Sequence, residues 1–152
     1  MSTIKQQIEQ DLKTAMLSGD KELATTLRGL KSAILYEEVA QGKRDEGLDD
    51  TTIMTVLQKE AKKRQDSADL YDQGNDAQRR DKELAEKAVI GKYLPKEMTD
   101  EELNTLIDGV VADKGPLTQQ TMGIIIGQVK QGSKGQADGA RIAQAVRERL
   151  SE

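Results

Sequence analysis

The segment YLPKEMTDEEL, residues 93–103, decides the fold, because it stops one helix and starts another. Pro95 has no amide hydrogen and disfavours a helical conformation at the preceding residue, so a helix must end near residue 94. Thr99 followed by Glu102 is the pattern of a capping box, in which each side chain bonds the other residue's amide at a helix start. The segment therefore predicts two domains, over residues 1–95 and 96–152.

The amino-terminal side carries four segments in which apolar residues recur at three- and four-residue spacing, as on one face of a helix. We expect helices over residues 2–17, 21–42, 51–71 and 77–94, with Asp20 and Asp50 capping the second and third. Helices joined by short loops in this way predict an antiparallel four-helix bundle. Side chains expected to face its core include Ile8, Leu12, Met16, Leu27, Leu30, Leu35, Ile53, Leu57 and Leu84.

The carboxyl-terminal side shows the same helical spacing three times. One helix follows the capping box and stops at Gly115-Pro116, a second covers residues 118–130, and a third covers residues 138–150. No segment alternates apolar and polar residues as a strand does. The predicted class is all-α, with an N-terminal four-helix bundle followed by a C-terminal three-helix bundle.

The amino-acid composition excludes several kinds of catalytic and metal-binding site. The 152 residues include no Cys and no His, so thiol nucleophiles, disulfides and zinc–thiolate sites are excluded, and the commonest general base is missing. We therefore predict no catalytic residues, no metal site and no cofactor. No apolar run is long enough to span a bilayer, and the N-terminus lacks an apolar secretory core, so a cytoplasmic protein is expected. The net charge of -4 argues against indiscriminate binding to polyanions.

One stretch stands out from this acidic background. Residues 114–137 contain three lysines, five glycines and no carboxylate. Such a stretch lets ammonium groups approach an anion without repulsion. We therefore predict that Lys130, Lys134 and Arg141 contact phosphates. Asp138 is expected to cap the last helix and so to occupy part of its anion-attracting start.

A second cationic group lies on the third predicted helix, where Lys62, Lys63 and Arg64 follow Lys59. One interpretation is a second phosphate contact. The other is a solvated helix face that Glu60 and neighbouring acids neutralise.

Gly123 and Gly127 lie four residues apart in the sequence MGIIIGQVK. This spacing favours close packing of neighbouring helices, because glycine permits close backbone approach. A glycine surface that admits a ligand is the alternative.

Several pieces of the chain, in this order, resemble the GatB/YqeY family, and the likeness covers nearly all residues. The pieces are Leu27-Arg28, Lys31-Ser32-Ala33-Ile34, Lys59-Glu60, Lys63-Arg64, Ser67, Tyr93-Leu94-Pro95, Glu101-Glu102-Leu103, Met122-Gly123, Gly135, Ala137-Asp138-Gly139, Val146 and Leu150. The resemblance, which is to a stand-alone YqeY-like protein, implies a four-helix and a three-helix bundle. It also implies kinship with the tail of the B subunit of the aspartyl/glutamyl-tRNA amidotransferase. That tail grips the tRNA body, whereas the amide chemistry takes place elsewhere in the enzyme.

The resemblance further implies that a carbon–nitrogen ligase label belongs to the whole amidotransferase and not to this module. Similar modules are fused to some glutaminyl-tRNA synthetases. In the last turn, Gln136 stands where an arginine is common in the family, which removes one cation from the predicted contact.

Three functional hypotheses follow. The leading one is a tRNA-binding accessory module that recognises backbone and shape, because aromatic residues make up only 2% of the chain. The second is a protein-interaction adaptor that docks onto an aminoacyl-tRNA synthetase or an amidotransferase. The third is an enzyme acting on an aminoacyl ester or amide, which the absence of His and Cys disfavours.

Overall fold

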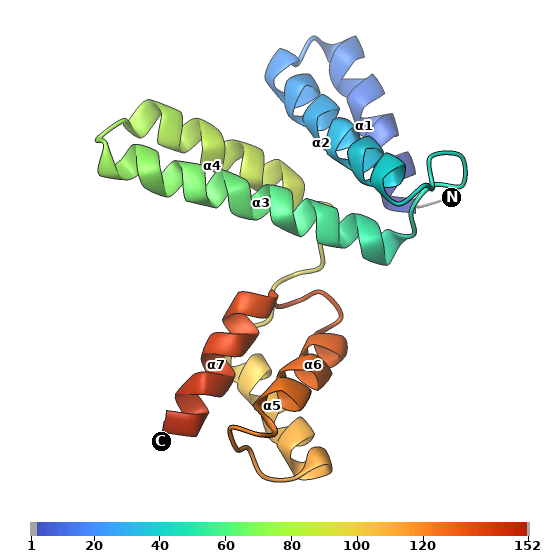
Figure 1. Ribbon diagram of the computed structural model, residues 1–152. Helices are drawn as coiled ribbons and strands as arrows, with labels where there is room; N and C mark the ends of the chain where they lie inside the picture. The colour runs from blue at the N-terminus through green and yellow to red at the C-terminus, as the bar shows by residue number, and fades with distance from the viewer. Residues whose placement is uncertain (1–2, 152) are drawn as a thin grey trace. The chain divides into compact units, whose positions relative to one another are not determined.

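The computed structural model describes residues 3–151, and this part of the chain forms seven α-helices and no strand (Figure 1). The prediction of an all-α protein is confirmed. The helices are α1 Thr3–Ser18, α2 Lys21–Ala40, α3 Asp50–Gln73, α4 Ala77–Gly91, α5 Asp100–Lys114, α6 Met122–Ser133 and α7 Gly139–Ser151. Residue 2, where the first helix was expected to begin, lies outside the described residues. Within residues 3–151 no helix combines the length and apolarity that crossing a membrane requires.

Three predicted helix starts are confirmed by their hydrogen bonds. The Asp20 side chain accepts from the Leu23 amide at 3.1 Å. At α5 both capping-box bonds form, from the Glu102 amide to Thr99 Oγ1 and from the Thr99 amide to Glu102 Oε1. Asp138 Oδ1 accepts from the Arg141 amide at 2.7 Å. Each bond satisfies an amide that has no partner inside its own helix.

Other boundaries differ from the prediction. Asp49, not Asp50, caps α3, because its carboxylate accepts from the Thr52 amide at 2.8 Å. Hydrogen bonds from the Thr52 side chain and then from this amide lower the pKa of Asp49. Helix α6 begins at Met122 and not at residue 118. The amides of Thr118 and Thr121 each bond the other residue's hydroxyl, and such local bonds compete with helix formation.

The first four helices pack as two hairpins, α1 with α2 and α3 with α4 (Figure 1). Their shared core is aliphatic, and its fully buried members include Ile8, Leu27, Leu30, Ile34, Ile53, Leu57 and Ile90. Met16, Leu35 and Leu84 were expected in this core but are exposed. Each of these helices buries one narrow stripe of aliphatic side chains, and these three residues lie outside it.

A buried ion pair joins α1 to α2. The Glu38 carboxylate is 1% exposed, and the Lys5 ammonium donates to both of its oxygens, at 2.9 and 3.0 Å. A buried carboxylate is stable only when it is paired in this way. The pair therefore fixes the register of the two helices.

A second polar bond joins the end of α4 to α1. The Tyr93 hydroxyl donates to Asp11 Oδ2. Burial, followed by this bond to a carboxylate and the charge of Asp11, raises the pKa of Tyr93. Tyr93 and Leu94 pack against the same core, so the chain stays attached to it up to the residue before Pro95.

Helices α5, α6 and α7 enclose a separate aliphatic core. Its buried members are Leu103, Ile107, Ile125, Val129, Ala137, Ile142 and Val146. The contacts of the chain group into two compact units, of which the first ends at Leu94 and the second begins at Pro95. That these units are two independent bundles stays a prediction.

We predict that Glu38→Ala lowers the free energy of unfolding by about 3 kcal/mol, because it removes the buried partner of a charged side chain. Urea denaturation followed by circular dichroism measures this loss. Glu46→Ala is the matched control, since Glu46 is exposed in the loop before α3, and we expect a change of about 0.5 kcal/mol or less. Equal effects of the two variants would contradict a structural role for the ion pair.

Candidate nucleic-acid interface

The turn between α6 and α7 presents Lys134 to solvent on a fixed backbone. Ser133 is fully buried and its hydroxyl donates to the Lys130 carbonyl at 2.8 Å, and Ala137 is buried in the core of this unit. Between these two anchors Lys134 adopts the left-handed conformation, with φ 50° and ψ 39°. That conformation is unfavourable for a residue with a Cβ atom, so the surrounding structure must impose it.

The turn is also bonded to the segment that precedes α5. The Met98 amide donates to the Gln136 carbonyl at 2.7 Å. Because Lys96 is only two residues before Met98, this bond brings a further exposed cation near the turn. No sequence pattern connects residues 96 and 136, so the sequence prediction missed Lys96.

Lys130 lies on α6, one helical turn before Lys134, and its side chain reaches the start of α7. Its ammonium nitrogen would lie 3.9 Å from a Cβ atom built on Gly139, the first residue of that helix. Lys130 and Lys134 are both exposed, and neither has a carboxylate within 4 Å among residues 3–151. The Lys130 ammonium thus lies close to the positive end of α7.

Arg141, the third predicted contact, is already engaged. Its guanidinium donates to Asp100 Oδ1 at 2.9 Å. The backbone amide of Arg141 also donates a hydrogen bond, to the carboxylate of Asp138. Arg141 therefore connects α7 to the start of α5, and a phosphate would have to compete with Asp100 for it.

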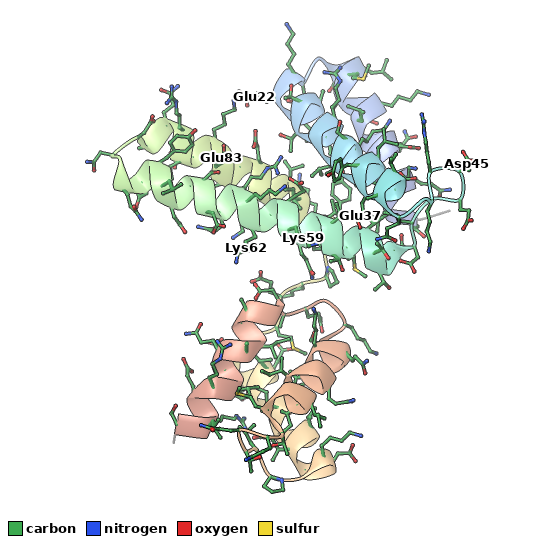
Figure 2. All side chains as sticks on the ribbon, viewed as in Figure 1. Glu22, Glu37, Asp45, Lys59, Lys62 and Glu83 are labelled. Carbon is green, nitrogen blue, oxygen red and sulfur yellow. The ribbon has the colours of Figure 1, made fainter. Side chains whose placement is uncertain are left out.

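The three predicted phosphate contacts on α3 also differ in whether a carboxylate pairs with them. Lys62 is exposed, has no carboxylate within 4 Å in the described chain, and points away from α3 (Figure 2). Lys63 pairs with Glu60 at 3.3 Å. Arg64 pairs with both Glu60 and Glu86. These pairs favour the interpretation of Lys63 and Arg64 as a neutralised helix face.

Arg64 has a structural contact as well. A Cβ atom on Gly29 of α2 would lie 3.8 Å from its guanidinium. The arginine therefore lies between α2, α3 and α4 and takes part in their packing. Lys62 belongs to the first compact unit, and Lys130 and Lys134 belong to the second. The unpaired lysines of the predicted contacts are thus divided between the two units.

The interpretation of Gly123 and Gly127 as a packing surface is wrong. A Cβ atom at either position would have no neighbour within 4 Å, so both glycines face open space. The glycine that does permit close packing is Gly132, where a Cβ atom would lie 3.0 Å from Leu106 Cδ1 of α5. The four-residue spacing of Gly123 and Gly127 therefore did not identify the glycine that packs against a neighbouring helix.

These features define an all-helical protein in which Lys62, Lys130 and Lys134 are exposed. Among residues 3–151 no cluster of three potential metal-ligating side chains occurs. A family model described as "Yqey-like protein" matches residues 5–150, so the chain belongs to the Yqey-like family. The resemblance inferred from the sequence is confirmed. The search of curated proteins gave no match to this chain.

We predict that Gly127→Ala raises the free energy of unfolding by about 1 kcal/mol, because alanine favours the helix and meets no neighbour. Gly132→Ala is the matched variant in the same helix, and we expect a smaller gain or a loss, since Leu106 must shift. Thermal and urea denaturation rank the two variants. A larger gain at residue 132 than at residue 127 would contradict the packing described for α6.

Proposed function

We propose that this protein is a tRNA-binding accessory module in which Lys130 and Lys134 contact backbone phosphates. The observation that carries the proposal is which cations of the second unit pair with a carboxylate and which do not. There Arg141, Arg149 and Lys114 are paired with Asp100, Asp108 and Asp113, whereas Lys130 and Lys134 lack a carboxylate within 4 Å in the described chain. An ammonium group without an internal partner gains most from an external phosphate.

Membership of the Yqey-like family supports the same proposal. The resemblance described above connects this family with the tail of the aspartyl/glutamyl-tRNA amidotransferase B subunit, which grips the tRNA body. By analogy, the protein would deliver or hold tRNA and leave the carbon–nitrogen ligase chemistry to another protein. Such a module would act in the cytoplasm, where tRNA is aminoacylated.

The proposed mode of recognition is backbone and shape. The chain has three tyrosines and no Phe or Trp, so extensive base stacking is excluded. Lys96 extends the contact at the α6–α7 turn. Arg141 orients the start of α7 beside it. Lys62 forms a second contact on α3, to which Lys63 and Arg64 contribute less because Glu60 neutralises them.

The division of the chain into two helical domains is also part of the proposal. We infer that residues 1–95 form a four-helix domain and residues 96–152 a three-helix domain, each with its own core. The separate aliphatic clusters and the grouping of contacts on either side of Pro95 support this division.

Binding to bulk tRNA at low salt tests the proposal. We predict that the double variant Lys130→Glu/Lys134→Glu binds about tenfold more weakly or worse, and that the slope of log affinity against log salt falls by about 1 to 2, because two phosphate contacts are lost. Fluorescence anisotropy over a salt series measures both quantities. Arg147→Glu is the matched control, since it reverses one exposed charge on α7 outside the turn. Failure of the wild-type protein to bind, or equal losses in control and double variant, would refute the proposal.

The variant Lys134→Gly tests whether Lys134 contributes to tRNA binding or only to the stability of the fold. Glycine adopts the left-handed conformation readily, so we expect this variant to be as stable as the wild type or more stable. It nevertheless removes one ammonium group and is expected to weaken tRNA binding. Loss of both stability and binding would assign Lys134 a structural role.

A second candidate function is supported by one apolar surface. Leu35, Tyr36 and Val39 lie on one face of α2 and are exposed, Tyr36 by 77%. This face fits the hypothesis of an adaptor that docks onto an aminoacyl-tRNA synthetase or an amidotransferase. Copurification of either enzyme after nuclease treatment, with loss of the enzyme in Tyr36→Asp, would favour the adaptor over the tRNA-binding module.

A further inference from the structure

The two arginines that join α7 to α5 are held unequally. Arg149 donates to Asp108 Oδ1 and also to the Asn104 carbonyl at 2.8 Å, so two groups of α5 fix its guanidinium. Within residues 3–151 the Arg141 side chain has a single such bond, to Asp100 Oδ1 at 2.9 Å. The Asp100 side chain is 94% exposed. Because water competes for an ion pair so exposed, Arg141 is the arginine that can change its partner.

This exchangeable pair lies beside the α6–α7 turn. The Arg141 amide donates to Asp138, so Arg141 belongs to the first turn of α7. Asp100 follows Met98 by two residues, and the Met98 amide donates to the Gln136 carbonyl of the turn at 2.7 Å. Because consecutive Cα atoms are about 3.8 Å apart, the Cα atom of Asp100 lies within about 8 Å of that of Met98. A polyanion that lies on the turn therefore approaches both the Arg141 guanidinium and the Asp100 carboxylate.

A phosphate is a better partner for Arg141 than Asp100 is. A guanidinium can donate two parallel N–H···O bonds to a phosphate, whereas Asp100 accepts one bond through one oxygen. The Asp100 carboxylate also repels an approaching phosphate. We infer that Asp100 is an internal competitor of RNA, which holds Arg141 in the unbound protein, lowers the affinity for tRNA and is displaced when a phosphate takes the arginine. The inference rests on the proposed function, because it concerns how strongly the same turn binds tRNA.

A purely structural role of Asp100 leads to a different expectation. Asp100 is the first residue of α5, where a carboxylate interacts favourably with the helix dipole. The start of α5 is also fixed by the capping box of Thr99 and Glu102, which does not use the Asp100 side chain. Replacing Asp100 by asparagine therefore leaves the helix start in place. If Asp100 served only to stabilise α5, this change would lower the stability and would not raise the affinity for tRNA.

Fluorescence anisotropy of the full chain with bulk tRNA tests the inference. Asp100→Asn is expected to bind tRNA about three- to tenfold more tightly than the wild type, because Arg141 no longer has to leave a carboxylate. Asp108→Asn is the matched control, since it removes the same charge from the same helix and leaves Arg149 bonded to the Asn104 carbonyl. We expect the control to change the affinity about twofold or less. Circular dichroism checks that both variants are folded.

The variant Arg141→Gln shows whether the gain in affinity depends on the arginine. In that background Asp100→Asn is expected to change the affinity about twofold or less, because only the repulsion by the carboxylate is removed. The inference is overturned if Asp100→Asn gains no more affinity than Asp108→Asn, or if its gain is undiminished in Arg141→Gln. The proposed function survives either result as long as Lys130→Glu/Lys134→Glu weakens binding. Absence of tRNA binding by both the wild type and Asp100→Asn would instead overturn the proposed function and this inference together.

Discussion

The pairing of charges is the constraint on which this structure depends. A chain that is 33% charged and has no Phe or Trp can bury only narrow aliphatic stripes, so its helices also rely on ion pairs at their edges. Lys5 with Glu38 joins α1 to α2, Arg64 with Glu86 joins α3 to α4, and Arg149 with Asp108 joins α7 to α5. Cations used in this way are neutralised. Residues 114–137 carry no carboxylate, and this gap leaves Lys130 and Lys134 available to an external anion.

The backbone of the α6–α7 turn adds a second reason to propose a function for Lys134. Lys134 and Gly135 both have positive φ, at 50° and 82°, and only the glycine adopts that conformation without strain. A glycine at residue 134 would be more favourable for the turn alone. A lysine held there by the buried neighbours Ser133 and Ala137 is consistent with selection for its charge, since backbone strain is often retained at functional positions.

The sequence predicted the helical architecture well because its signals are local. The Thr99–Glu102 capping box and the Asp138 cap each act within four residues, and both lie where helices begin. The predicted helix end at residue 94 was wrong, because α4 already ends at Gly91, four residues before Pro95. The candidate site was less predictable, because its pairing depends on residues far apart. Arg141 meets Asp100 across 41 positions, and Lys96 approaches the turn through the bond from Met98 to Gln136. Gly132, which packs on Leu106, has no distinguishing pattern, whereas the regular spacing of Gly123 and Gly127 corresponds to open surface.

The most direct test of the proposed interface is a nuclear magnetic resonance titration of the isotope-labelled protein with bulk tRNA. If the unpaired lysines contact phosphate, amide shifts should concentrate in residues 130–141 and at Lys96, with weaker changes around Lys62, and they should vanish at high salt. Shifts confined to the exposed face of α2, or no shift at tRNA concentrations that saturate other tRNA-binding proteins, would contradict a nucleic-acid contact at the α6–α7 turn.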